Sequence, residues 1–138
     1  MTRPYLIVEG GGTLFALAQE VVREIVPARS FTRLPGAPPA VRGLLNVRGT
    51  LLTVLDLSQR FGRGSATATD ASVVIGVTNG RSLGLLVDDV HEVHGFADGD
   101  FVSTSTDVAD SAVMGLGHFG DRIVLAVDLQ ELARQTLA

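Results

Sequence analysis

The sequence contains an internal repeat. Residues 13–21 (TLFALAQEV) align with residues 82–90 (SLGLLVDDV) at an offset of 69, and residues 55–57 (LDL) align with residues 127–129 (VDL) at an offset of 72. Each copy reads as a hairpin, a long strand, a loop, a strand and a helix. A unit of about 65 to 70 residues has a marginal core by itself, so the two copies are expected to pack together. The repeat predicts one mainly β domain, residues 1–138, built from two small β-barrels or curled sheets at roughly 13–65 and 70–138, with strand exchange at the termini.

Residue alternation and turn signals predict the individual elements. Strands are predicted over residues 5–8, 13–18, 19–26, 47–55, 72–78, 83–93 and 122–127. The apolar residues of 19–26 also fit the spacing of a helix. Val and Ile dominate there and a proline follows, which favours a strand. Pro39 is predicted to open one helical turn that ends at Gly43. Asp56 and Asp128 are predicted to be the N-caps of short helices.

Composition and charge exclude several classes of protein. The net charge of −4 argues against a nucleic-acid surface, and the absence of cysteine excludes disulfides and thiolate metal sites. No apolar run approaches the roughly 18 to 20 residues that span a bilayer. These features predict a cytoplasmic protein without direct membrane insertion.

The stretch DDVHEVH, residues 88–94, is the most enzyme-like part of the sequence. Asp89 and His91 share one face of a strand, and His118 is the only histidine outside this stretch. A metal site needs three or four convergent ligands, which a strand does not bring together here. No nucleophile and base occur at a recognisable spacing. The sequence therefore predicts no catalysis, no metal and no cofactor.

Arg48 and Glu24 are the remaining candidates for a functional site. An arginine with a nearby carboxylate forms a charge-assisted hydrogen bond. When such a pair is exposed it adds little stability, so a role at a partner surface would explain it better. From spacing alone, Arg48 could equally be a solvated residue at a strand end.

Several segments together resemble the chemotaxis coupling protein (CheW-like) family. The stretch LPGAPPAVRGLLNVRGTLLTVLDLSQRFG, residues 34–62, is similar to the family signature. VREIV (22–26), GLLVDDVHEV (84–93) and MGLGHFGDRIVLAVDLQELA (114–133) match further family segments in order. The resemblance implies two five-stranded, SH3-like β-barrel subdomains packed together and short helices, including one at the C-terminus.

The resemblance also implies a function and its site residues. The family implies a non-catalytic adaptor that couples the cytoplasmic tip of chemoreceptors to the regulatory domain of the histidine kinase CheA, at membrane-associated receptor arrays. Glu24 and Arg48 look like a functionally important ion pair, and whether it forms in the free protein stays open. The other implied partner-binding positions are Val22, Gly43, Val87 and Val90.

Two other interpretations remain at this stage. The chain could be a CheW-like regulatory domain of a larger kinase, since the fold is shared. It could also be a small metal-binding enzyme that uses Asp89, His91 and His118. The sequence names neither the pathway nor the cognate receptor and kinase.

Overall fold

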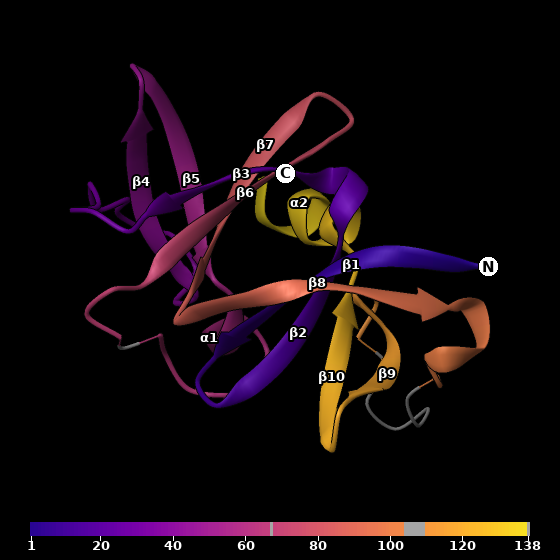
Figure 1. Cartoon of the computed structure of the whole chain (residues 1–138). Helices are drawn as coiled ribbons and strands as arrows, with labels where there is room; N and C mark the ends of the chain where they lie inside the picture. Colours follow the sequence, from indigo (N-terminus) through magenta and orange to yellow (C-terminus); the bar gives the residue numbers. More distant parts are fainter. Residues whose placement is uncertain (67, 104–109, 138) are drawn as a thin grey trace.

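The computed structural model describes residues 1–66, 68–103 and 110–137, which form two five-stranded sheets and two short helices (Figure 1). Sheet 1, in the order β8-β1-β2-β10-β9, comprises β1 (Thr2–Gly10), β2 (Thr13–Ala18), β8 (Asp89–Ala97), β9 (Val113–Phe119) and β10 (Arg122–Val127). Sheet 2, in the order β3-β6-β7-β5-β4, comprises β3 (Val22–Pro27), β4 (Val41–Val47), β5 (Thr50–Asp56), β6 (Ser72–Thr78) and β7 (Arg81–Val87). The predicted fold class, mainly β with two five-stranded units packed together, is confirmed.

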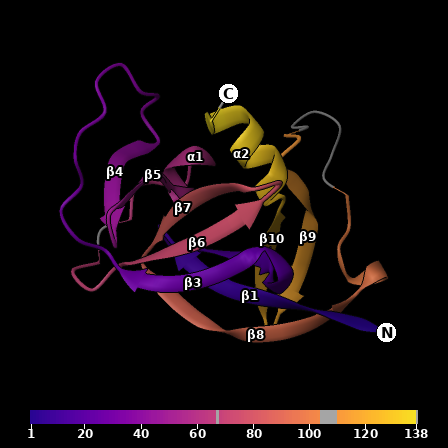
Figure 2. The ribbon, with the colours of Figure 1, turned by 90° about the horizontal axis from the view of Figure 1, so that it is seen from above.

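The two sheets repeat one strand order. Replacing each strand of sheet 2 by its counterpart in the other copy (β3 by β8, β6 by β1, and so on) gives the order of sheet 1. Each sheet therefore combines a hairpin of one copy with the outer strand and second hairpin of the other. Figure 2 shows the two sheets from above with α2 (Leu129–Leu137) near their junction. The boundaries of the sequence copies, 13–65 and 70–138, stay a prediction.

The chain crosses from sheet 2 to sheet 1 at Asp88. The sequence predicts one strand over 83–93, and this prediction is wrong, because β7 ends before Asp88 and β8 begins after it in the other sheet. The Asp88 amide donates to the Glu9 carbonyl at 2.8 Å, and its carboxylate accepts from the amides of Gly11 at 2.9 Å and Ala68 at 2.8 Å. These contacts hold the crossing point against the first hairpin.

The predicted strand over 47–55 is also interrupted. Arg48 and Gly49 form the turn of the β4–β5 hairpin, with φ of 51° and 87°. Two successive residues with positive φ are typical of a tight hairpin turn. The Asn46 side chain stabilises it by accepting a hydrogen bond from the Gly49 amide at 2.8 Å. Arg48 therefore lies at the tip of a hairpin and not within a strand.

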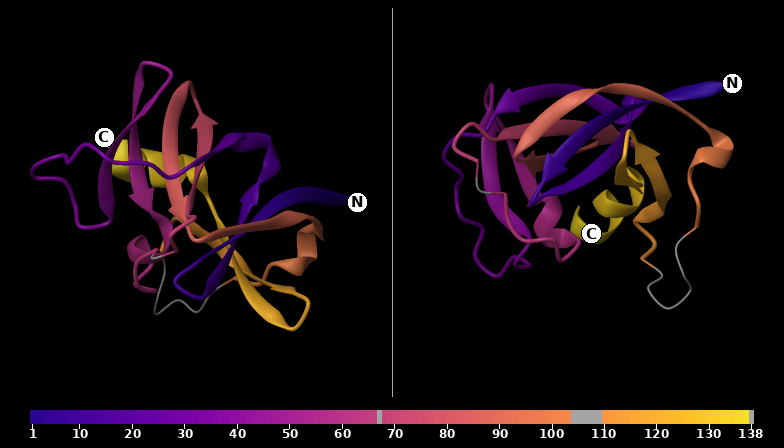
Figure 3. Two further views of the ribbon diagram at one scale, coloured as in Figure 1. Left: turned by 60° about the vertical axis from the view of Figure 1, so that its left-hand side comes forward. Right: turned by 60° about the horizontal axis from the view of Figure 1, so that its bottom comes forward.

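Two smaller predictions are also corrected by the structure. Residues 19–21 form a 3-10 turn, η1 (Gln19–Val21), so only the part from Val22 onward is strand. No helical turn runs from Pro39 to Gly43, because β4 begins at Val41 and pairs with β5. Figure 3 shows η1 leading the chain from sheet 1 into β3 of sheet 2.

A shared core joins the two sheets. It contains Leu6 and Phe15 from sheet 1, Leu83 and Leu85 from sheet 2, and Leu132 from α2. Each sheet also encloses a smaller cluster of its own. Burial of apolar area is the main driving force of folding, so the shared cluster makes each half depend on the other.

Both helices are short and are capped as predicted. Asp56 caps α1 (Leu57–Arg60) by accepting from the Gln59 amide at 3.2 Å, and Asp128 accepts from the Glu131 amide at 3.3 Å at the start of α2. Among the described residues, no helix has the length and apolar character needed to cross a membrane.

Asp56 does more than cap a helix. Its side chain is completely buried, and its two oxygens also accept hydrogen bonds from Ser58 Oγ at 3.0 Å, the Ala66 amide at 3.0 Å and Arg42 Nη1 at 3.2 Å. One carboxylate therefore ties α1 to β4 and to the connection that follows α1.

We expect Asp56→Ala to lower the free energy of unfolding by roughly 3 kcal/mol, because it leaves buried hydrogen-bond donors without an acceptor. The matched variant Asp128→Ala removes a cap on a half-buried residue and should cost about 1 kcal/mol. Urea denaturation followed by circular dichroism measures both. Equal losses would show that the additional contacts of Asp56 contribute nothing.

Candidate partner-binding site

The β4–β5 hairpin presents Arg48 to Glu24 on β3. Arg48 Nη2 donates a hydrogen bond to Glu24 Oε1, and the side chains are 71% and 30% exposed. The pair forms within this single chain. The hydrogen bond from Arg48 lowers the pKa of the Glu24 carboxyl, and the same bond raises the pKa of Arg48.

The ion pair links the two outer strands of sheet 2. β3 and β4 end the strand order on opposite sides, and they are not paired with each other. In sheet 1 the corresponding outer strands approach through a different contact, because the rings of His94 on β8 and Phe119 on β9 lie 5.2 Å apart, edge to face. The two copies thus share a fold but differ chemically where their outer strands meet.

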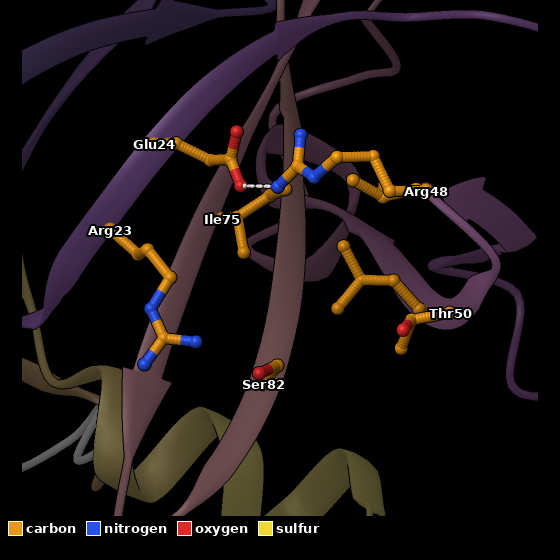
Figure 4. A pocket seen from close by; sticks show the side chains of 8 residues that line it. Arg23, Glu24, Arg48, Thr50, Ile75 and Ser82 are labelled. Carbon is orange, nitrogen blue, oxygen red and sulfur yellow. Dashed lines mark hydrogen bonds and ion pairs between the residues drawn. The ribbon is translucent and has the colours of Figure 1, made fainter.

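A pocket of about 250 Å³ lies beside the ion pair (Figure 4). Figure 4 shows Glu24 and Arg23 on one side and Arg48 on the other, with Ile75 between them. The wall also includes the apolar side chains of Val47 and Leu52. An apolar floor with a charged rim can receive a side chain from a partner, and the charges fix its orientation.

The hairpin also carries an exposed apolar side chain that does not line this pocket. Leu51 is 61% exposed, whereas its neighbour Leu52 is buried, as expected where strand residues alternate between faces. The sequence prediction missed Leu51, Arg23 and Ile75. Leu51 could have been found once the turn at Arg48 was recognised, but Ile75 is brought to the site only by the pairing of β3 with β6.

Gly43 is a structural position and not a contact surface. It is buried in β4 at a bulge, with φ of 140°, and an added Cβ would lie 2.3 Å from the Thr32 carbonyl oxygen. The segment around Thr32 pairs with Leu44 and covers this edge of sheet 2. A side chain at Gly43 would therefore displace the segment that joins β3 to β4.

Val87 is placed where a partner cannot touch it. It is 0% exposed and belongs to the shared core, so the expectation that it faces a receptor is wrong. Val22 and Val90 are half-buried against that core and occupy equivalent places, each near the start of a strand that follows a crossing. The structure therefore brings together Glu24 and Arg48 but not Val87.

The DDVHEVH stretch lies at a charged surface beside Glu9 and Arg122. His91 Nε2 lies 2.9 Å from Glu9 Oε1, which also accepts from Arg122 Nη1 at 3.1 Å. The guanidinium supplies a positive charge that would oppose a bound cation. Across the described ranges, no group of three or more His, Asp or Glu is arranged to hold a metal ion.

Comparison with known proteins identifies relatives along nearly the whole chain. A family model described as a CheW-like domain matches residues 4–137. Chemotaxis protein CheW of Rhizobium meliloti (strain 1021) is 32% identical over 126 residues, covering 88% of this chain and 81% of that protein. Chemotaxis protein CheW of Klebsiella aerogenes is 26% identical over 132 residues, covering 93% of this chain and 80% of that protein.

A solved structure is similar over the same extent. The scaffolding protein TtCheW from Thermoanaerobacter tengcongensis matches with a TM-score of 0.83 and 27% identity, covering 94% of this chain and 86% of that one. The resemblance stated from the sequence is thereby confirmed at the level of both sequence and fold.

We expect Gly43→Ala to lower the free energy of unfolding by about 3 kcal/mol, because it combines positive φ with a clash against backbone. Gly36→Ala is the control, since Gly36 also has positive φ (78°) but nothing within 4 Å of an added Cβ. It should cost about 1 kcal/mol. Chemical denaturation of both variants tests this, and a Gly43→Ala protein as stable as Gly36→Ala would contradict it.

The ion pair also predicts a pH dependence. Because the pKa of Glu24 is lowered in the folded chain from 4.5, its stabilising effect is present above the unfolded value and is lost as the pH falls through the folded value. We expect NMR titration to give Glu24 a pKa below 4.5 and Arg48→Gln to raise it. A Glu24 pKa that is unchanged by Arg48→Gln would show that the pair does not form in solution.

Proposed function

Since the chain belongs to the CheW-like domain family, whose members are non-catalytic scaffold and adaptor proteins, we propose that it couples chemoreceptors to the histidine kinase CheA. The observation that carries the proposal is the exposed Glu24–Arg48 pair beside an apolar pocket. Such a pair adds little to folding, so its value lies in recognition. The coupling takes place in the cytoplasm, at receptor arrays that the partners attach to the membrane.

The receptor tip is helical and offers apolar and charged side chains at helical spacing. Helix-in-groove docking uses apolar anchors for contact area and charges for register. Leu51 at the hairpin and half-buried Val22 and Val90 supply apolar contacts, and Arg48 supplies a fixed charge. Val22, Glu24, Arg48 and Val90 are the partner-facing residues of this proposal, while Gly43 and Val87 act through the fold.

Kinase control follows from how the adaptor is held. A bound adaptor transmits a signal only if its contacts with the partners differ between receptor states. A rigid domain with a joint core keeps two binding surfaces in fixed relation. A change at the receptor-facing surface is then passed to the kinase as a change in the adaptor's orientation.

We expect the wild-type chain to bind both a fragment of the receptor tip and the CheA regulatory domain. Arg48→Glu should weaken at least one of these interactions tenfold or more, because it places two like charges together at positions 24 and 48 and reverses the charge that the hairpin offers to a partner. Isothermal titration calorimetry measures the affinities, and thermal unfolding checks that the fold is intact.

Arg63→Glu is the matched control. Arg63 is exposed and lies beyond α1, at the other end of β5 from Arg48. The same change of charge there should leave both affinities within about twofold. Folded wild-type protein that binds neither partner would overturn the proposed function. Equal losses of affinity in Arg48→Glu and Arg63→Glu would show that the Glu24–Arg48 surface is not the binding site.

A further inference from the structure

Arg60 connects the two copies of the repeat through its side chain. It is the last residue of α1, in the first copy, and its Nη1 and Nη2 donate to Oδ2 and Oδ1 of Asp110 at 2.9 and 3.1 Å. Nη2 also donates to Gln135 Oε1 on α2 at 2.7 Å. Asp110 and Gln135 belong to the second copy, and Figure 2 shows α1 and α2 next to each other. A planar guanidinium is suited to this two-pronged contact, which a lysine cannot make.

The guanidinium of Arg60 is also held from below. Its Cζ lies 4.8 Å from the centre of the Phe61 ring, and that ring lies 5.7 Å from the ring of Phe15 in the shared core. The side chains of Arg60 and Asp110 are only 23% and 28% exposed, and the hydrogen bond from Arg60 lowers the pKa of the Asp110 carboxyl. Partial burial and a two-pronged geometry distinguish this pair from an exposed ion pair, which contributes little.

Asp110 fixes the chain where β9 begins. Its Oδ1 accepts from the Ala112 amide at 3.0 Å, and its carbonyl accepts from the Val113 amide at 2.9 Å. The Ala112 carbonyl in turn accepts from the Asp128 amide at 2.8 Å, at the start of α2. Holding Asp110 therefore holds the first residues of β9 and of α2 together.

The first copy has an equivalent corner, 72 residues earlier. The Val41 amide donates to the Pro38 carbonyl at 2.9 Å, and the Asp56 amide donates to the Ala40 carbonyl at 2.7 Å, which repeats the backbone pattern of the second copy. Proline stands at position 38, where the second copy has Asp110. The two corners therefore share a backbone, but only position 110 offers a carboxylate.

The arginine that ties each corner comes from a different copy. In the first copy, Arg42 on β4 donates to Asp56 at 3.2 Å, so the corner is tied by its own arginine. The counterpart of Arg42 in the second copy is Met114, which cannot bind the counterpart carboxylate, Asp128. Arg60 of the first copy supplies the charged contact that the second corner lacks.

We propose that Arg60 is a positioning residue for coupling, because its contact with Asp110 and Gln135 sets where β9 and α2 lie relative to α1. The Arg48 hairpin, β5, α1 and Arg60 follow one another directly in the chain, and Asp56 fixes α1 to the end of β5. Through Asp110 this unit holds β9, an outer strand of the other sheet. The role in coupling rests on the proposed function, whereas the contact itself exists in the free chain.

In the free chain, we expect Arg60→Ala to raise amide hydrogen-exchange rates in β9 about tenfold or more, while rates in β6 and β7 stay within about twofold. β9 is an outer strand, so it can open locally while the shared core stays folded. The pKa of Asp110, measured by NMR, should rise towards its ordinary value. An equal increase of exchange in both sheets, or unchanged exchange in β9, would overturn the proposal.

Arg134→Ala is the matched control. Arg134 is 67% exposed and pairs with Glu131 inside α2 at 2.6 Å, so its loss removes an arginine from α2 but leaves the contact between the copies intact. Exchange in β9 should then match the wild type. Arg60→Lys keeps the charge but loses the two-pronged contact, so exchange in β9 should rise as in Arg60→Ala. Wild-type exchange in Arg60→Lys would contradict the assigned geometry.

With the receptor-tip fragment and the complete kinase, we expect Arg60→Ala to separate binding from control. Affinities should stay within about threefold of the wild type, while the change in kinase activity that the receptor fragment produces should fall about fivefold or more. Unaltered control would overturn the positioning role. A wild-type chain that gives no control would overturn the proposed function instead, and the exchange rates would then decide whether Arg60 ties the two copies.

Discussion

The chain crosses between its two sheets at η1 and at Asp88, and these crossings determine where every other element lies. Because β3 leaves the first hairpin for sheet 2, it becomes the outer strand beside β6, and Glu24 is carried to the same surface as the β4–β5 hairpin. β8 makes the reciprocal crossing. Neither half can therefore complete its sheet alone, and the shared core of Leu6, Leu83 and Leu132 forms only when both are folded.

Two carboxylates in this fold illustrate different uses of charge. Asp56 is buried and accepts four hydrogen bonds, so it fixes the position of α1 and stabilises the fold. Glu24 is partly exposed and accepts from an arginine that is largely in solvent. Water screens the second pair, so it adds little to folding, but it holds Arg48 in a defined direction at the edge of the pocket.

Much of the architecture could be predicted from the sequence, because the repeat, the glycine turns and the aspartate caps are local patterns. The break at Arg48–Gly49 could not, since apolar residues continue on both sides and the turn depends on the Asn46 side chain. The break at Asp88 depends on contacts with Glu9 and Gly11, far away in sequence. The expectation for Val87 came from the family resemblance and not from a local pattern, and its burial depends on the core that the two sheets share.

The central claim is that the Glu24–Arg48 pair serves recognition more than folding. The charge-swapped variant Glu24→Arg/Arg48→Glu tests it directly, because the swap preserves an ion pair within the chain but reverses the charge offered to a partner. The account predicts that the swapped protein unfolds at the wild-type denaturant concentration and binds the receptor-tip or kinase fragment at least tenfold more weakly. Wild-type affinity in the swapped protein would contradict the claim, since it would show that only the internal pair matters.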